Sequence, residues 1–258
     1  MAHGPRTIVV TGAGGVVGRA VTHGFLGQGD SVIAVGRSQE SLDSLNDAVR
    51  SAFGAEVRLH LCQVDLLDVN APNFLSERVS ELREGDIVLV NNARNLRNVS
   101  RMVETRSLRA AFQSEHELGV AVPFELSVTL SERFGSALVA VINVGSQYGL
   151  VAQNPLVYED YAAEAAPHYG TTKAALFHLT RELSVRLAGF GTRVNAIALG
   201  GIKGRASNEF EERYRKMLPL GRMLEPADVV GPVLFLASPS ARAVTGHTLA
   251  VTGGWEIV

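Results

Sequence analysis

Short apolar runs alternate with segments of helical periodicity along the chain. Runs rich in Val, Ile and Leu predict seven strands, at Arg6–Thr11, Ser31–Val35, Val57–Val64, Asp86–Val90, Ala137–Asn143, Arg193–Leu199 and Thr248–Val251. Apolar positions three and four residues apart predict helices at Val16–Leu26, Gln39–Phe53, Phe74–Leu82, Leu108–Phe134, Tyr169–Leu187, Asn208–Met217 and Pro226–Ala237. Because strands that are apolar throughout are buried on both sides, this alternation predicts a parallel sheet with helices on both faces.

Nothing along the sequence divides the chain into separate parts. It contains no internal repeat, no low-complexity stretch and no linker rich in Pro, Gly and Ser. We therefore expect residues 1–258 to form a single, doubly wound α/β domain. The opening residues, Met1 to Arg6, are polar, and no apolar run approaches the roughly 20 residues of a membrane span. This predicts a cytoplasmic protein with no membrane partner.

Composition narrows the kinds of function. Hydrophobic residues make up 46% and charged residues 19% of the chain, which is typical of a globular protein rather than a disordered one. A formal net charge of −2 does not indicate nucleic-acid binding, and the histidines are not spaced as metal ligands, so we expect no metal site. The single cysteine, Cys62, lies in an apolar run and is expected to be a core residue rather than a nucleophile.

A glycine-rich turn joins the first predicted strand to the first predicted helix. The sequence TGAGGVVG, residues 11–18, places glycines at positions 12, 15 and 18. Gly12 permits a tight turn, Gly15 lets the backbone approach a phosphate, and Gly18 lets the helix pack closely on the strand. Because a helix N-terminus attracts anions, this context predicts a dinucleotide pyrophosphate site; the alternative is a glycine-rich turn without a ligand.

The end of the second predicted strand bears on the choice of dinucleotide. NAD-binding sites usually carry an acidic residue here, but this chain has Gly36 followed by Arg37. A guanidinium binds a 2′-phosphate in a forked geometry, whereas a carboxylate repels it. We therefore expect NADP(H) in preference to NAD(H); the alternative is that Arg37 is a solvated surface charge.

Motifs of a known type occur at seven places: TGAGGVVG (11–18), VDLLD (64–68), NNA (91–93), NVGSQYG (143–149), YGTTK (169–173), RVNAIALGG (193–201) and LFLASPSARAVTGHTLAVTGG (234–254). In their order and spacing they resemble the short-chain dehydrogenase/reductase family over nearly the whole chain. The resemblance implies a Rossmann-type sheet with strand order 3-2-1-4-5-6-7 and one dinucleotide-binding and catalytic domain.

The resemblance also implies a set of cofactor contacts. Asp65 would lie by the adenine, Asn91 and Ala93 along the cofactor, and Ile202 by the nicotinamide amide. The full set of residues expected to bind the cofactor is Gly12, Gly14, Gly15, Val16, Val17, Arg37, Ser38, Asp65, Leu66, Asn91, Asn92, Ala93, Tyr169, Lys173, Gly200 and Ile202.

Three side chains are candidates for the chemistry. Tyr169 and Lys173 are four residues apart and therefore share one helical face. A free tyrosine has a pKa of about 10, but a nearby ammonium favours the phenolate and lowers that pKa. Ser146 would hydrogen-bond the substrate oxygen and stabilise the charge that develops there. Together they predict hydride transfer between nicotinamide and a carbonyl or secondary alcohol, with Tyr169 as general acid and base. The alternative for an isolated Tyr–Lys pair is a surface contact.

The sequence departs from the family pattern at several positions. Val16 stands where compact members usually carry glycine, and the 23 positions from Ser146 to Tyr169 are more than compact members have. Both features resemble the branch that modifies nucleotide sugars. The catalytic asparagine of the family is absent, with Gly119 or His116 in its place according to the alignment, and Leu199 replaces a common proline.

A cluster of cations follows the NNA motif. Arg94 stands where the family usually has glycine, and Arg97 and Arg101 come after it. Such a cluster either binds a carboxylate or phosphate of the substrate or belongs to a solvated loop. We take Arg94, Gln147 and Tyr148 as candidate substrate contacts.

The combination resembles a subgroup of flagellin-modification and acylneuraminate-pathway oxidoreductases, which implies a sugar or sugar-nucleotide substrate. Two alternatives stay open: a generic keto or 3-oxoacyl substrate, and a catalytically silent member that only binds dinucleotide. The resemblance also implies a homo-oligomer, a dimer or tetramer formed through the long helices and the C-terminal strand.

Overall fold

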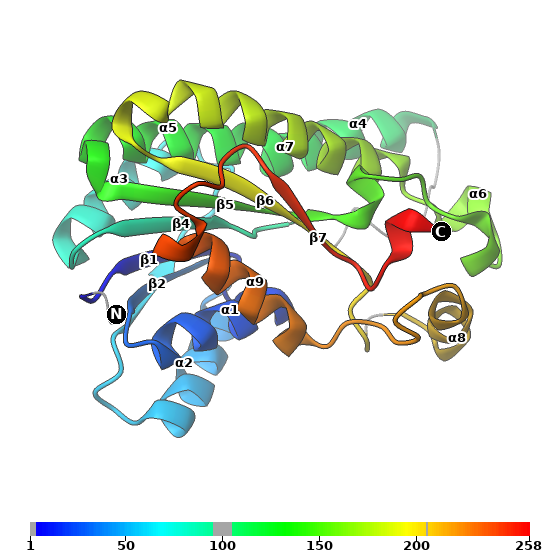
Figure 1. Ribbon diagram of the computed structural model, residues 1–258, viewed down its shortest axis with the longest axis horizontal. Helices are drawn as coiled ribbons and strands as arrows, with labels where there is room; N and C mark the ends of the chain where they lie inside the picture. The colour runs from blue at the N-terminus through cyan, green and yellow to red at the C-terminus, as the bar shows by residue number, and fades with distance from the viewer. Residues whose placement is uncertain (1–3, 95–104, 205) are drawn as a thin grey trace.

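The computed structural model of the chain describes residues 4–94, 105–204 and 206–258. At its centre lies a parallel sheet of seven strands in the order β3-β2-β1-β4-β5-β6-β7 (Figure 1). The strands are β1 (Thr7–Thr11), β2 (Ser31–Gly36), β3 (Leu59–Gln63), β4 (Ile87–Asn91), β5 (Leu138–Ser146), β6 (Arg193–Leu199) and β7 (Thr248–Val251). The expected Rossmann-type fold and strand order are thereby confirmed.

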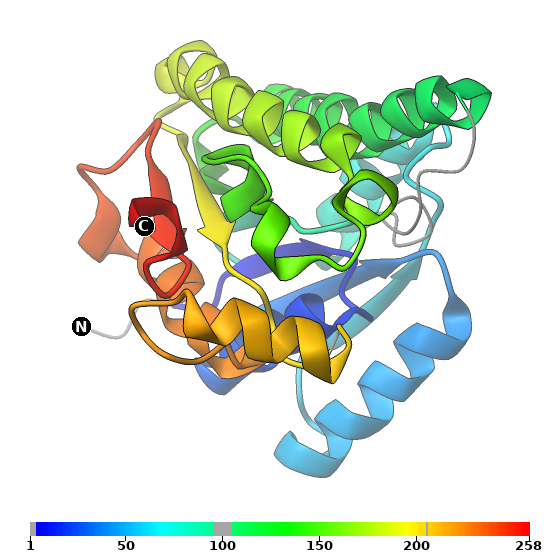
Figure 2. The same ribbon diagram turned by 90° about the vertical axis from the view of Figure 1, so that its right-hand side faces the viewer.

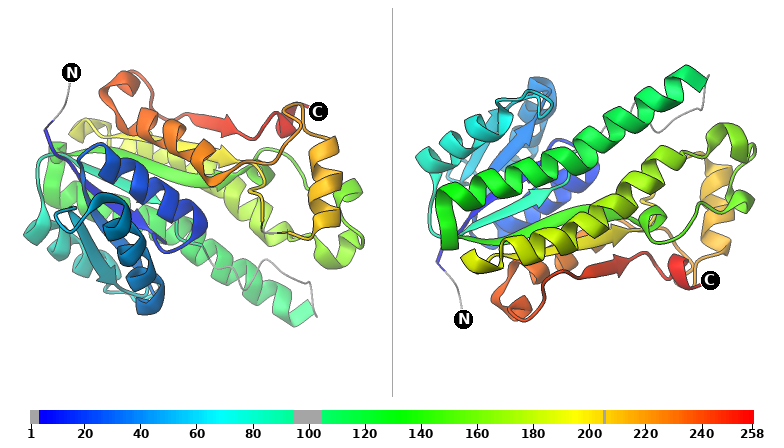
Figure 3. Two further views of the ribbon diagram at one scale, coloured as in Figure 1. Left: turned by 90° about the horizontal axis from the view of Figure 1, so that it is seen from below. Right: turned by 90° about the horizontal axis from the view of Figure 1, so that it is seen from above.

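Helices cover both faces of the sheet (Figures 1 and 3). One face carries α1 (Val16–Gly27), α2 (Gln39–Phe53) and α9 (Pro226–Ala237); the other carries α3 (Ala71–Leu82), α4 (Thr105–His116), α5 (Val122–Phe134) and α7 (Pro167–Arg186). The short helices α6 (Tyr161–Glu164) and α8 (Asn208–Lys216) lie beyond the carboxyl ends of the strands (Figures 1 and 2).

Alternate residues of each strand supply the two apolar cores. In β1, Ile8 and Val10 pack toward α1 and α9, whereas Val9 packs toward α3 and α5. All three are at most 1% exposed, and burying a side chain of this size contributes about 1.5–3 kcal/mol to folding. Cys62 is buried in the second core, as expected. None of the described helices is both long and apolar enough to cross a bilayer.

The helix predicted over Leu108–Phe134 is interrupted. Between α4 and α5 the segment Glu117–Ala121 forms a π turn, in which the N–H of Val122 donates to the carbonyl of Glu117. Pro123 lies at the start of α5 and has no N–H to donate, so the regular α-helical ladder is broken at this point. Gly119 within the turn faces α7, because a Cβ at this position would come 2.6 Å from Cγ2 of Thr172.

A buried ion pair joins segments that are distant in sequence. One terminal nitrogen of Arg6 lies 2.7 Å from the Asp30 carboxylate, and the two side chains are 5% and 1% exposed. Its other terminal nitrogen donates to the carbonyl of Ala237 at 2.8 Å. The start of β1, the residue before β2 and the end of α9 are therefore held by one guanidinium.

Candidate active site

The carboxyl ends of the strands meet along one edge of the sheet. The chain crosses from β1 to β2 and β3 on one side and returns to β4 on the other, so a crevice opens between the ends of β1 and β4. In doubly wound sheets this is the place where ligands bind. Two neighbouring cavities lie here, and Val17, Asn92 and Arg94 line both.

The first cavity, of about 330 Å³, surrounds the glycine turn. Gly12 has a φ of +63°, and a Cβ at Gly18 would overlap the carbonyl oxygen of Gly12, so both positions require glycine. Gly15 is the N-cap of α1 and offers no side-chain acceptor to the helix N–H groups. Arg19 steadies the turn, since its guanidinium donates to the carbonyls of Gly14 at 2.8 Å and Ser41 at 3.0 Å. The arrangement fits an anion at the helix N-terminus.

Arg37 and Ser38 line the outer part of the same cavity. Both are exposed, and Ser38 also caps α2 by accepting from the N–H of Ser41. Within the described part of the chain no carboxylate pairs with the Arg37 guanidinium. This end of the crevice therefore offers a cation and a hydroxyl to a ligand.

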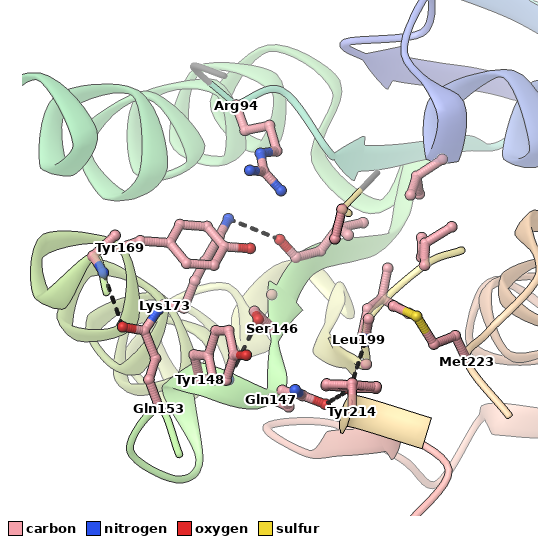
Figure 4. Close-up of a pocket in the computed structure, with 18 of the residues that line it drawn as sticks. Arg94, Ser146, Gln147, Tyr148, Gln153, Tyr169, Lys173, Leu199, Tyr214 and Met223 are labelled. Carbon is pink, nitrogen blue, oxygen red and sulfur yellow. Dashed lines mark hydrogen bonds between the residues drawn. The ribbon is translucent and has the colours of Figure 1, made fainter. Parts of the chain in front are cut away.

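The three predicted catalytic residues converge on the second cavity, of about 420 Å³ (Figure 4). Ser146 is the last residue of β5, while Tyr169 and Lys173 lie on the buried face of α7. The side chains are 6%, 8% and 4% exposed. Lys173 Nζ donates to the carbonyl of Val144 at 3.1 Å and lies 5.7 Å from the centre of the Tyr169 ring. Ser146 and Tyr169, which are 23 positions apart in the sequence, thus line the same cavity.

The charges around Tyr169 favour its ionised form. Burial by itself raises the pKa of this phenol, but Arg94, Lys173 and a hydrogen bond with Ser146 outweigh it, so the pKa lies below its ordinary value. The pKa of Lys173 is also below its ordinary value. Burial lowers it most and Arg94 lowers it further, while Tyr169 and Glu115 act in the opposite direction. Tyr169 is therefore more readily ionised than a free tyrosine, a property that is common at functional sites.

Arg94 lies nearer to the phenol ring than Lys173 does. Its guanidinium carbon lies 4.9 Å from the centre of the Tyr169 ring, and the side chain points into the cavity (Figure 4). Its Nε is buried and has no hydrogen-bond partner in the described part of the chain. The guanidinium thus keeps donor capacity for a ligand. Arg97 and Arg101 lie outside the described residues.

The opposite wall of the cavity is aromatic and amide-rich. Tyr214 of α8 donates to Gln147 Oε1 at 2.6 Å (Figure 4). It also accepts from the N–H of Gly201 at 2.8 Å, and its ring stacks on that of Trp255 with 4.3 Å between the ring centres. Burial raises the pKa of Tyr148 and of Tyr214, so these phenols stay neutral, in contrast to Tyr169. The sequence indicated Gln147 and Tyr148 but not Tyr214, whose only signal was its place on the apolar face of α8.

Several predicted cofactor residues lie elsewhere. Asn91 donates to Asn143 Oδ1 at 2.9 Å inside the sheet, and Leu66 belongs to the apolar core. The Asp65 carboxylate accepts from the N–H of Leu67, and the N–H of Ala93 donates to Thr11 Oγ1. Asn91, Leu66, Asp65 and Ala93 line neither cavity, and their contact with a cofactor stays a prediction. Besides Arg37, Ser38, Tyr169 and Lys173, the predicted cofactor residues that do line the cavities are Gly12, Gly14, Gly15, Val16, Val17, Asn92, Gly200 and Ile202.

Two further expectations concern metals and the missing asparagine. The described residues include no cluster of His, Cys, Asp and Glu suited to a metal ion. His116 is exposed and Gly119 packs on Thr172, so neither places a polar side chain beside Lys173.

Comparison with known proteins gives concordant matches. A family model described as enoyl-(acyl carrier protein) reductase matches residues 12–256. The galactitol 2-dehydrogenase (L-tagatose-forming) of Cereibacter sphaeroides is 30% identical over 96% of this chain and 94% of that protein. A 3-oxoacyl-(acyl-carrier-protein) reductase of Aquifex aeolicus is 30% identical over 95% of each chain. A crystal structure of a proposed NAD(P)-dependent gluconate 5-dehydrogenase of Beutenbergia cavernae, with NADP at low occupancy, has a TM-score of 0.81 and 28% identity, with 98% and 97% of the chains covered.

A doubly wound sheet with a glycine turn at its switch point and a Tyr–Lys pair beside it defines a class of nicotinamide-dependent oxidoreductases. Because the family model and the relatives span nearly the whole chain, this protein belongs to the short-chain dehydrogenase/reductase family. The family resemblance inferred from the sequence is thereby confirmed. The narrower subgroup, which modifies flagellin or acylneuraminates, stays a prediction.

Proposed function

We propose that the protein is an NADP(H)-dependent oxidoreductase that interconverts a carbonyl and a secondary alcohol on a sugar-like substrate. The observation that carries the proposal is the convergence of Ser146, Tyr169 and Lys173 on one cavity, with cations that lower the pKa of the Tyr169 phenol. A lone surface Tyr–Lys pair would not be buried in this way.

The residues of the first cavity fit a dinucleotide. The glycine turn and the start of α1 would hold the pyrophosphate, because a Cβ at Gly18 has no room and no side chain caps the helix. Arg37 and Ser38 would bind a 2′-phosphate, which is the reason for preferring NADP(H) to NAD(H). The bound nicotinamide supplies or accepts the hydride.

The side chains of the second cavity handle the proton and the charge. In reduction Tyr169 donates its proton to the carbonyl oxygen, and in oxidation its phenolate accepts the proton of the alcohol. The Ser146 hydroxyl donates a hydrogen bond to that oxygen as charge develops there. Lys173 and Arg94 stabilise the phenolate between the two states.

The cavity wall favours a polyhydroxylated substrate. Gln147, Gln153 and Tyr148 offer hydrogen-bonding groups, and the rings of Tyr148 and Tyr158 offer apolar faces to C–H groups. Arg94 would bind an acidic group on the substrate. The names of the related galactitol 2-dehydrogenase and of the proposed gluconate 5-dehydrogenase also favour a polyhydroxylated substrate.

A second candidate substrate is a 3-oxoacyl thioester. A largely apolar cavity of about 540 Å³ adjoins the site and shares Tyr148, Gln153 and Ala166 with it. Such a cavity has room for an acyl chain, and the related acyl-carrier-protein reductase acts on that class.

The test is a substrate panel with NADPH and NADP⁺ that contains keto sugars, polyols, sugar acids and 3-oxoacyl thioesters. We expect turnover of a sugar or sugar acid, and a Tyr169→Phe variant slowed by about 10²–10⁴-fold. Tyr161→Phe, which removes a hydroxyl on the exposed helix α6 outside the catalytic cavity, is the matched control for the sugar substrates. Full activity in Tyr169→Phe refutes the mechanism, preference for the thioester selects the second candidate, and NADPH binding without any turnover identifies a silent member.

A further inference from the structure

Glu115 is a buried carboxyl group that the chemistry proposed above does not use. It lies on α4, its side chain is 2% exposed, and its Oε2 makes no hydrogen bond in the described part of the chain. A carboxylate without partners in the interior is costly unless opposite charges lie nearby. The groups that surround Glu115 therefore decide what it does.

Helix α4 packs against α7, the helix that carries the catalytic pair (Figure 3). One turn before it, the Phe112 ring lies 5.8 Å from the ring of His168, which precedes Tyr169. One turn after it, Gly119 faces Thr172, which precedes Lys173. Because residues three and four positions apart share a helical face, Glu115 lies between these two contacts and faces the same stretch of α7.

The π turn at Glu117–Ala121 begins two residues after Glu115. An extra residue in a helical turn changes the face that the preceding residues present, and such turns often occur at functional sites. Here the interruption accompanies the presentation of an acidic side chain to the catalytic helix. The neighbouring acidic residue of the same stretch, Glu117, is exposed.

The charged and titratable groups that face Glu115 come from two elements. His168, Tyr169 and Lys173 belong to α7, and Arg94 belongs to the segment after β4. Burial raises the pKa of Glu115, while Lys173, Arg94 and His168 favour its charged form. In return, the Glu115 charge raises the pKa of Lys173 and of Tyr169.

We propose that Glu115 is a positioning residue: its buried carboxylate on α4, facing the catalytic stretch of α7, balances the positive charges of Lys173 and Arg94 beside the Tyr169 phenol. The proposal rests on the proposed function, in which Tyr169 exchanges a proton with the substrate. Glu115 touches no reacting atom in this account and acts through Lys173 and Tyr169.

The first test compares Glu115→Gln, which keeps the shape and removes the charge, with the exposed control Glu117→Gln. In alcohol oxidation, kcat/KM rises with pH as Tyr169 ionises and falls as Lys173 loses its proton. We expect both limbs of the profile to move to lower pH by about one pH unit in Glu115→Gln. Glu115→Asp should bring both limbs back toward the wild-type positions, and Glu117→Gln should leave them unchanged. Unmoved limbs in Glu115→Gln, with or without a lower melting temperature, overturn the proposal.

A second readout does not depend on turnover. With ¹³Cζ-labelled tyrosine, the resonance lost in Tyr169→Phe reports the ionisation of Tyr169 directly by NMR. We expect its titration to move to lower pH in Glu115→Gln even if no substrate is turned over, so a failure of the proposed function can be told apart from a failure of the charge coupling. An unchanged titration overturns the inference even in an active enzyme.

If Glu115→Gln does not fold, Lys173→Met tests the same coupling from the other side. The Glu115 carboxyl resonance, assigned with Glu115→Asp, should then titrate at higher pH than in the wild type because an opposite charge has been removed. An unchanged titration of Glu115 refutes the coupling.

Discussion

Arg94 provides the most direct test of the electrostatics of the site. Its guanidinium carbon lies 4.9 Å from the centre of the Tyr169 ring, and among the groups that lower the pKa of this phenol Arg94 contributes most, ahead of Lys173. Replacing Arg94 with Gln removes the charge but keeps a polar side chain of similar length. Because the phenolate then loses a stabilising cation, the pKa of Tyr169 must rise.

The magnitude follows from Coulomb's law. For charges roughly 5 to 8 Å apart at an effective dielectric constant of about 20, the interaction is roughly 2 to 3 kcal/mol, or about two pH units. Arg94 is partly exposed on the side that faces the cavity, and solvent there screens the interaction. We therefore expect the pKa of Tyr169 to rise by about one pH unit.

The assay is the pH dependence of kcat/KM for alcohol oxidation. The acid limb, which reports formation of the Tyr169 phenolate, should move to higher pH in Arg94→Gln and stay near its wild-type position in Arg94→Lys. Arg109→Gln removes an exposed cation from α4 and is the control for a general change in charge. If the acid limb of Arg94→Gln stays in place or moves to lower pH, the reasoning is wrong. Arg94 would then bind the substrate without stabilising the Tyr169 phenolate.

Three further predictions concern the cofactor site and the cavity wall. Arg37→Ala should weaken NADPH binding by about 10-fold or more and NADH binding little in fluorescence titrations, since only NADPH carries the 2′-phosphate; equal losses for both would argue against that contact. Gly18→Ala should abolish dinucleotide binding and lower the melting temperature, because the added Cβ overlaps the Gly12 carbonyl, and tight binding by this variant would contradict the model of the turn. Tyr214→Phe should lower the free energy of unfolding in urea by about 1–3 kcal/mol, because Gln147 Oε1 and the N–H of Gly201 lose their partner; unchanged stability would show that other groups replace the hydroxyl.

The sequence predicted best what depends on neighbouring residues. The glycine turn lies within eight residues between a strand and a helix, so spacing alone indicated its role. Tyr169 and Lys173 share a helical face for the same reason. Alternating apolar runs were enough for the sheet, because buried parallel strands leave a strong pattern.

What the sequence did not predict depends on contacts between distant segments. Glu115 and Lys173 are brought together by helix packing and by a π turn. The apolar pattern of Leu108–Phe134 predicted one continuous helix and did not indicate this turn. Tyr214 reaches Gln147 across 67 positions. For the stretch between Ser146 and Tyr169, the sequence indicated its length but not the turns that it forms.

In the structure that stretch forms short turns, each begun by a polar side chain. Ser146 accepts from the N–H of Tyr148, Asn154 from that of Leu156, and Asp160 from that of Ala163. These local bonds let a segment of short helical turns hold Tyr148 and Tyr158 at the cavity. No periodic pattern in the sequence predicts such an arrangement, because each turn depends on the geometry of its own side chain.

The buried Arg6 guanidinium has a consequence for the order in which the molecule is completed. Its acceptors, Asp30 and the carbonyl of Ala237, are made early and late in synthesis, respectively. In a nascent chain that has not yet emerged as far as α9, one nitrogen of this guanidinium lacks its acceptor. The first β–α units then also lack the helix that packs on them, so they are less stable than in the complete protein. The active-site crevice, whose walls include Leu199, Tyr214 and Met223, is thus completed only as the final third of the polypeptide leaves the ribosome.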